Sequence, residues 1–107
     1  MSMLKWDREF ALEQAADDAE LLDELLNIFK DSFQTDLKLV EEGVAENSSE
    51  KVSSAAHSIK GAAASLGILG INEVALTIEE DARSGSIDNA RKNLPVLHEL
   101  LQELLQL

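Results

Sequence analysis

Cysteine is absent from the sequence, and aromatic residues make up only 4% of it. Without cysteine the chain has no disulfide framework, no thiolate zinc site and no cysteine nucleophile, which fits a reducing compartment. The scarcity of rings disfavours a β-sandwich or β-barrel, because those folds build their cores from aromatic and β-branched side chains. Hydrophobic residues still amount to 45%, so the chain can bury an aliphatic core.

Basic residues are also few: 9 lysines and arginines stand against 21 acidic residues, which leaves a net charge of −12. A phosphate backbone or an anionic membrane surface repels such a chain, so neither nucleic acid nor a membrane is expected as a partner. No segment approaches the roughly 18 consecutive apolar residues of a membrane span, and residues 1–10 are too charged for a signal peptide. We expect a cytoplasmic protein with a single domain over residues 1–107.

Apolar residues recur at three- and four-residue steps along nearly the whole chain, which is the spacing of amphipathic helices. Glycine, asparagine and serine interrupt this pattern at residues 47–49, 67–70 and 84–86. Short connections force neighbouring helices to run antiparallel. The pattern therefore predicts an all-α fold, an up-down-up-down antiparallel four-helix bundle with a short N-terminal helix. The expected helices cover about residues 6–15, 17–46, 47–67, 71–84 and 86 onward.

Particular residues are expected to fix the ends of these helices. Asn47 is the candidate N-cap of the helix over residues 47–67, with Glu50 three residues later as in a capping box, and Gly67 is expected to end that helix. Ser86 is the candidate N-cap of the last helix. Pro95 lies inside the last helix, where the loss of one backbone donor predicts a bend and not a break.

The helical spacing also predicts which side chains face the core. The leading helix is expected to lay Trp6 and Phe10 on the bundle as a lid. The first long helix has the inward stripe Leu22, Leu25, Leu26, Phe29, Phe33, Leu37, Val40 and Val44. The last two helices have the inward residues Ile71, Val74, Ala75, Ile78 and Ala82, and Ile87, Ala90, Leu94, Leu97, Leu101 and Leu104.

The helix expected over residues 47–67 is unusual because its polar face consists mainly of small residues. When this helix is projected at about 100° per residue, its apolar residues fall on one side. The opposite side carries Glu50, Ser53, Ser54, His57, Lys60, Gly61 and Ala64. A glycine inside a helix costs roughly 1 kcal/mol relative to alanine. The position of Gly61, one turn from His57, therefore suggests that another surface must approach the imidazole closely.

The chemistry of these residues suits a carrier of phosphoryl groups. A neutral imidazole is a competent nucleophile near pH 7, because its unperturbed pKa is about 6.5. Lys60 lies on the same face as His57, where its ammonium disfavours a second positive charge on the ring and could pair with an attached anion. From these residues alone two interpretations are equally good. His57 is either a phosphoryl acceptor or a solvated polar residue beside a tolerated glycine.

The run His57-Ser58-Ile59-Lys60-Gly61-Ala62-Ala63-Ala64-Ser65-Leu66-Gly67 resembles the signature of histidine-containing phosphotransfer (HPt) domains, including the related N-terminal domain of chemotaxis histidine kinases. The shared features are the histidine, an aliphatic residue two places on, Lys-Gly at the third and fourth places, small residues, and a final hydrophobic-glycine pair. The flanking patterns over residues 21–33 and 74–85 are similar as well. The resemblance therefore covers most of the chain, and it implies the same four-helix architecture.

The resemblance implies a role for each residue of the motif. His57 corresponds to the phosphoacceptor, through its Nε2 atom, and Lys60 to the cation beside the phosphoryl group. Gly61 corresponds to the gap that admits a receiver domain, and Gly67 to the turn into the next helix. Glu79 corresponds to a position where members of the family carry glutamine or glutamate facing the histidine. If Glu79 accepts the Nδ1 proton, Nε2 is left free as the nucleophile; the alternative is that the run at residues 79–81 is a solvated acidic face.

The implied docking surface is a patch of small residues ringed by apolar side chains from the first long helix. Its members are Ser53, Ser54, Gly61 and Ala64. The chain has no carboxylate cluster placed to bind Mg²⁺, so any Mg²⁺ is expected on the partner receiver domain, and no intrinsic cofactor is expected. The two histidines are far apart without a metal-ligand spacing, so no metal site is expected, and His98 is expected to be a structural histidine at the rim.

The sequence thus predicts a phosphoryl carrier and not an enzyme. It accepts a phosphoryl group from the phosphoaspartate of a response-regulator receiver domain onto His57 and passes it to another receiver, with a hybrid histidine kinase as a further possible partner. We expect it to be a monomer. Two alternatives remain: a helical interaction module that is never phosphorylated, and the phosphoaccepting input domain of a larger histidine kinase. Retention of His57, Lys60 and Gly61 together counts against the first, and the length of the native gene product distinguishes the second.

Overall fold

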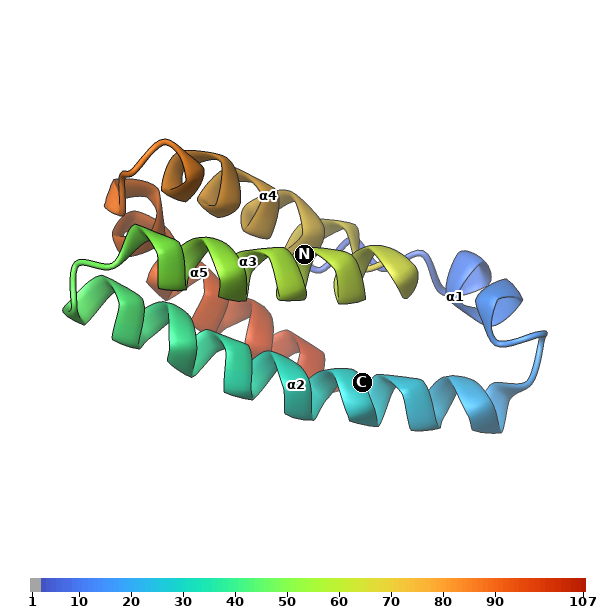
Figure 1. Ribbon diagram of the computed structural model, residues 1–107. Coiled ribbons are helices and arrows are strands. Elements are labelled where there is room, and N and C mark those ends of the chain that lie inside the picture. The colour runs from blue at the N-terminus through green and yellow to red at the C-terminus, as the bar shows by residue number, and fades with distance from the viewer. Residues whose placement is uncertain (1–2) are drawn as a thin grey trace.

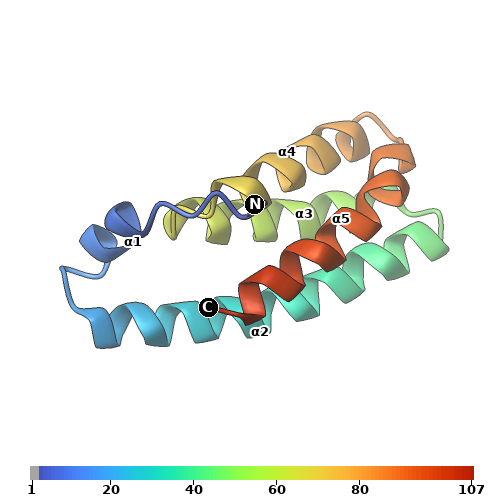
Figure 2. The same ribbon diagram turned by 180° about the vertical axis from the view of Figure 1, so that it is seen from behind.

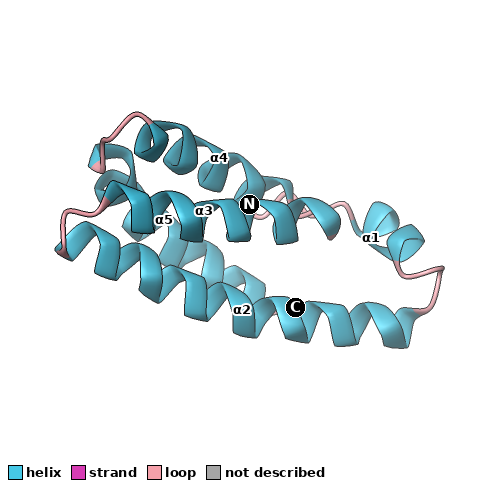
Figure 3. Cartoon of the chain, viewed as in Figure 1, coloured by secondary structure: helices cyan, strands magenta, loops and turns pink. Residues whose placement is uncertain are grey.

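The computed structural model describes residues 3–107, which form five α-helices and no β-strand (Figures 1 and 3). The expected all-α fold is confirmed. The molecule is elongated, with dimensions of 42 × 24 × 19 Å. The helices are α1 (Arg8–Gln14), α2 (Ala19–Ala45), α3 (Ser49–Ser65), α4 (Leu69–Arg83) and α5 (Asp88–Leu105).

The four long helices lie side by side along the long dimension of the molecule. Helix α3 packs against α2 on one side and α4 on the other, and α5 packs against both α4 and α2. Helix α5 lies behind the other helices in Figure 1 and in front of them in Figure 2. Their apolar faces meet in one core, as the helical spacing predicts. Of the residues predicted to face inward from α2, all are buried except Leu25 and Val44, which are half-buried.

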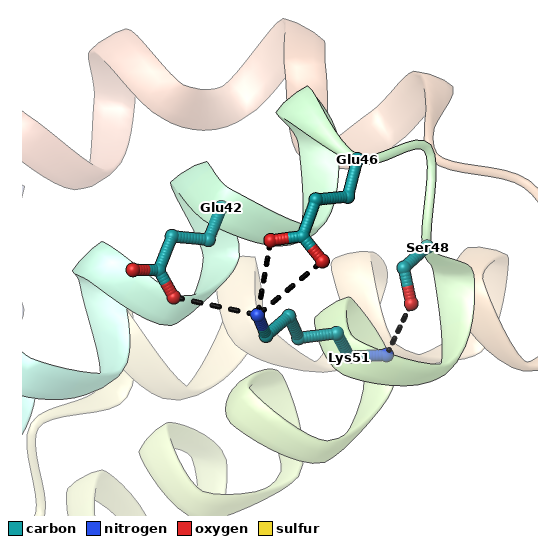
Figure 4. A network of polar contacts seen from close by, with 4 residues as sticks. All are labelled: Glu42, Glu46, Ser48 and Lys51. Carbon is teal, nitrogen blue, oxygen red and sulfur yellow. Dashed lines mark hydrogen bonds and ion pairs between the residues drawn. The ribbon is translucent and has the colours of Figure 1, made fainter.

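The turn between α2 and α3 is capped by Ser48, so the prediction of Asn47 as the N-cap is wrong. The Ser48 side chain accepts a hydrogen bond from the Lys51 backbone N–H at 3.2 Å. Asn47 has a positive φ of 56°, a left-handed conformation that asparagine tolerates at the end of a helix. The Lys51 ammonium lies 3.1 Å from the Glu46 carboxylate and 3.5 Å from that of Glu42 (Figure 4). The Ser48 cap and these ion pairs all lie where α3 begins.

Helix α5 begins at Asp88, and the residue before it, Ile87, has no capping side chain. The predicted cap, Ser86, lies one residue further back, and its hydroxyl still accepts a hydrogen bond from the Asp88 backbone N–H at 3.1 Å. The prediction is therefore wrong by one position but right about the hydrogen bond. The helix continues through Pro95, so the expected absence of a break is confirmed. The bend stays a prediction.

The segment before α1 lies along the turn between α3 and α4. The half-buried Trp6 donates its indole N–H to the Leu66 carbonyl at 2.9 Å, and the Asp7 backbone N–H bonds to the Gly67 carbonyl at 2.9 Å. Trp6 thus covers this end of the molecule, as predicted. Phe10 lies beside Gly67 but remains 37% exposed, so it forms a less complete lid than expected.

None of the helices within residues 3–107 combines the length and the hydropathy needed to cross a bilayer.

Candidate functional site

His57 lies near the middle of α3, on the face opposite the core. The core face of α3 buries Val52, Ala55, Ala56, Ile59 and Ala63. The His57 side chain is 63% exposed. The small residues predicted around it, Ser53, Ser54, Gly61 and Ala64, are all exposed or half-buried. At Gly61, an added Cβ would meet nothing within 4 Å, so the space one turn beyond the imidazole is open.

Glu79 is buried beneath this exposed imidazole. Its side chain, on the neighbouring helix α4, is only 2% exposed, and its Oε2 atom lies 2.8 Å from Nδ1 of His57. The next residue in the acidic run, Glu80, is exposed. The structure thus brings Glu79 to His57, and for this residue the alternative of a solvated acidic face is wrong.

Two cations share the Glu79 carboxylate with His57. The Lys60 ammonium lies 2.6 Å from Oε1, and an Arg83 guanidinium nitrogen lies 2.9 Å from Oε2. Arg83 was not predicted as a residue of the site. Its spacing of four residues from Glu79 on one helix was the available signal, because residues four apart lie on the same face.

These contacts determine the charge on Glu79. Burial raises the pKa of its carboxyl, but hydrogen bonds from Lys60 and His57 and the charges of Arg83 and Lys60 lower it more, so the pKa lies below its ordinary value. The carboxylate is therefore ionised at neutral pH and can only accept hydrogen bonds. His57 must then carry its hydrogen on Nδ1 when the ring is neutral. The free lone pair is then on Nε2, so Nε2 is the ring atom that can act as a nucleophile.

Further hydrogen bonds hold α3 to both neighbours at the level of the site. The Ser58 hydroxyl donates to the Asp36 carboxylate of α2 at 2.8 Å. On the other side, the Asn72 side chain of α4 donates to the backbone carbonyl of Lys60 at 3.1 Å. The helix that carries His57 is therefore fixed relative to the helix that carries Glu79.

The surface of α3 borders two hollows, of which the first reaches His57. A depression of about 460 Å³ lies between α3 and α4, and its lining includes Ser53, Ser54, His57 and Arg83. A groove of about 310 Å³ lies between α2 and α3. Its lining is mostly apolar and includes Leu25, Ile28, Phe29, Ala62 and Ser65. The apolar side chains that the sequence analysis expected from the first long helix thus lie beside α3.

Gly67 and His98 lie outside the cluster around Glu79. Gly67 has a φ of +68° directly after the C-cap of α3, so it makes the expected turn toward α4. His98 lies on α5 with Nε2 3.5 Å from the Glu41 carboxylate, and both side chains are about half exposed. Within residues 3–107 no group of three or more histidine, cysteine, aspartate or glutamate side chains is placed to hold a metal ion.

The fold and the site define an all-helical protein that presents an oriented imidazole beside two cations. The sequence model of the Hpt domain matches residues 24–107, and the chain therefore belongs to the Hpt domain family. Its function is phosphotransfer in a two-component phosphorelay.

A solved structure, the HPt domain from a sensor hybrid histidine kinase of Shewanella, has a similar fold, with a TM-score of 0.72. The likeness covers 98% of this chain and 88% of the other at 21% sequence identity. No curated protein matches the chain significantly.

Proposed function

We propose that His57 accepts a phosphoryl group from the phosphoaspartate of one receiver domain and passes it to a second receiver. The observation that carries this proposal is the pair formed by His57 and Glu79. The ring is 63% exposed while its Nδ1 atom is held at 2.8 Å by a buried carboxylate. Such a pairing orients the ring and leaves Nε2 as the reactive atom.

In the proposed step, the Nε2 lone pair attacks phosphorus in line with the bond to the aspartyl oxygen. The N–P bond forms, the P–O bond breaks, and the aspartate leaves as a carboxylate. Because Nδ1 keeps its hydrogen, the phosphorylated ring is positively charged, and the negative charge of Glu79 stabilises it. Transfer to the second receiver is the reverse reaction.

Lys60 and Arg83 supply positive charge beside the ring. In the unphosphorylated protein both contact Glu79, but each has further N–H donors that can reach an anion while keeping that contact. We expect them to stabilise the phosphoryl group and its transition state. In phosphoryl transfer, positioning and charge stabilisation provide most of the catalysis.

The docking surface for the receiver is proposed to surround His57. It comprises Ser53, Ser54, Gly61 and Ala64 on α3 and extends onto the apolar groove beside Leu25 and Ile28. The low bulk of the α3 residues lets the phosphoaspartate reach Nε2. Any Mg²⁺ needed for the reaction is expected on the receiver domain.

The proposal also includes predictions about the whole protein. The four long helices form an up-down-up-down antiparallel bundle, and residues 1–107 constitute one HPt domain. The protein is a monomeric cytoplasmic carrier and not an enzyme in its own right. Because the structural relative comes from a hybrid histidine kinase, a kinase of that type is a candidate member of the same relay.

The test is transfer from phosphorylated receiver domains. Wild type should acquire an acid-labile, alkali-stable phosphate, whereas His57→Gln should acquire none. Lys60→Ala and Arg83→Ala should keep the helical fold, with some loss of stability, but slow transfer by about ten- to a hundredfold, the scale of losing one charge contact in a transition state. No label on wild type with any of several receivers, or equal label on His57→Gln, would contradict the proposal.

A further inference from the structure

Asp36 brings a carboxylate from a different helix to Ser58, the residue that follows the phosphoacceptor. It lies on α2, and its Oδ2 atom accepts a hydrogen bond from the hydroxyl of Ser58, the residue after His57, at 2.8 Å. Ser58 is exposed and Asp36 is half-buried, so both can be reached from solvent. Neither residue has a part in the phosphoryl transfer described above.

Asp36 also stands at the end of the apolar groove between α2 and α3. The groove is lined from α2 by Leu25, Ile28, Phe29 and Ser32, and Asp36 follows Ser32 by one helical turn. None of the side chains that line this groove is charged. Ile28 is 65% exposed, more than any other large hydrophobic residue in the described part of the chain. A partner that covers this groove and reaches His57 must therefore also cover Asp36.

Covering Asp36 has an energetic consequence. Burial within the protein already raises the pKa of its carboxyl, against the opposing effect of the hydrogen bond from Ser58. A partner that removes the remaining water without replacing it leaves a poorly solvated carboxylate, which weakens docking. A partner that brings an ammonium or guanidinium group instead forms a complementary ion pair.

We propose that Asp36, held by Ser58, determines which receiver domains dock productively on this protein. The favoured receiver places an apolar ridge in the groove beside Ile28 and a lysine or arginine side chain against Asp36. Receivers with a neutral or acidic residue at that point dock poorly. This inference rests on the proposed function, because it assumes that a receiver covers His57.

The experiment compares Asp36→Asn with Asp23→Asn as a matched control. Asparagine keeps an oxygen that can accept the Ser58 hydrogen bond, so the first variant removes the charge and little else. Asp23 is an exposed aspartate on the same helix, about 140° around from Asp36 at 100° per residue. Transfer from the receiver that phosphorylates wild type fastest is measured at several salt concentrations.

For Asp36→Asn we expect the KM for the phosphorylated receiver to rise about five- to tenfold with little change in the maximal rate. The salt dependence of kcat/KM should also become shallower. Asp23→Asn should behave as wild type. Substituting the facing basic residue of the receiver by alanine should raise KM for wild type but add little to the effect of Asp36→Asn.

The inference is overturned if Asp36→Asn and Asp23→Asn have the same KM and the same salt dependence while wild type is phosphorylated normally. In that case the proposed function stands and only the role of Asp36 is wrong. If wild type is phosphorylated by no receiver, both fail together.

Discussion

The site depends most on Glu79, a buried carboxylate with three donors. A carboxylate taken out of water is destabilising unless hydrogen bonds and opposite charges replace its hydration. His57, Lys60 and Arg83 supply these contacts at 2.8, 2.6 and 2.9 Å. The same residue therefore orients the imidazole and keeps two cations beside it before any partner arrives.

The first prediction concerns the pH dependence of this network. The pKa of Glu79 is lower in the folded protein than its ordinary value of 4.5, so ionisation of Glu79 favours the folded state. That contribution is complete above the ordinary value and is lost as the pH falls through the lower folded value. At pH 7 we expect Glu79→Gln to lower the free energy of unfolding by about 1–2 kcal/mol, because charged hydrogen bonds are replaced by neutral ones.

Urea unfolding of wild type and Glu79→Gln between pH 7 and pH 3 measures this difference. It should shrink toward the acid end of the range, where the wild-type carboxyl takes up a proton. Glu80→Gln, an exposed neighbour, is the control and should change little at any pH. A difference between wild type and Glu79→Gln that stays constant or grows on acidification would contradict the assignment of Glu79 as an ionised buried group.

How much of the site could be predicted differs from residue to residue. The outward positions of His57, Lys60 and Gly61 followed from the helical projection, because residues three and four apart share a face. The burial of Glu79 did not follow, since an acidic run on a helix is usually solvated. Glu79, the first residue of that run, is buried only because α4 packs against α3. The ion pair between Arg83 and Glu79 could be recognised only once this packing was known.

At the scale of elements, Gly43 allows α2 and α3 to approach closely. An added Cβ at Gly43 would lie 2.7 Å from a methyl group of Val52 and 3.1 Å from the Val52 backbone nitrogen. Val52 is fully buried, so neither group can move away easily. Gly61 is the opposite case, since it lies inside a helix with open space around its missing side chain.

The second prediction uses this contrast. Gly43→Ala should lower the free energy of unfolding by about 1–3 kcal/mol, the usual cost of overpacking. Gly61→Ala should raise it by up to about 1 kcal/mol, because alanine is the better helix former and meets no neighbour. Chemical denaturation of the two variants gives both values. Equal effects of the two substitutions would mean that Gly43 is not a point of close contact.

The positions of the helices were predicted better than their ends. Long amphipathic segments have many apolar residues that agree on one face, so their existence is well specified by the sequence. A cap depends on one or two hydrogen bonds, and Asn47 and Ser48 are both good capping residues. The structure selects Ser48 because Asn47 takes the left-handed conformation that turns the chain out of α2.

At the scale of the whole molecule, the N-terminal segment closes the end where α3 meets α4. Leu4 is buried, and its carbonyl accepts a hydrogen bond from the Gly70 backbone N–H at 2.7 Å. A Cβ on Gly70 would overlap the Met3 carbonyl oxygen. The family match begins only at residue 24, whereas the likeness to the solved HPt domain covers 98% of the chain. The segment is thus part of the fold although it lies outside the family match.

The third prediction is that Gly70→Ala displaces this segment. Trp6 is the only tryptophan, so its fluorescence reports on the contact with the α3–α4 turn. In Gly70→Ala the emission should shift to the red, toward that of a solvated indole, and the melting temperature should fall. Far-UV circular dichroism should still show the long helices. An unchanged emission maximum would mean that the segment is held by contacts other than the one at Gly70.

Glu79 holds Nδ1 of His57 at 2.8 Å, which leaves Nε2 to react. NMR spectroscopy of the phosphorylated protein, with ¹⁵N-labelled histidine and ³¹P detection, tests it most directly because it identifies the nitrogen that carries the phosphate. We expect a single phosphohistidine, at position 57, with phosphorus bonded to Nε2 and a hydrogen on Nδ1. Phosphate on Nδ1, on His98 or on a residue other than histidine would contradict it.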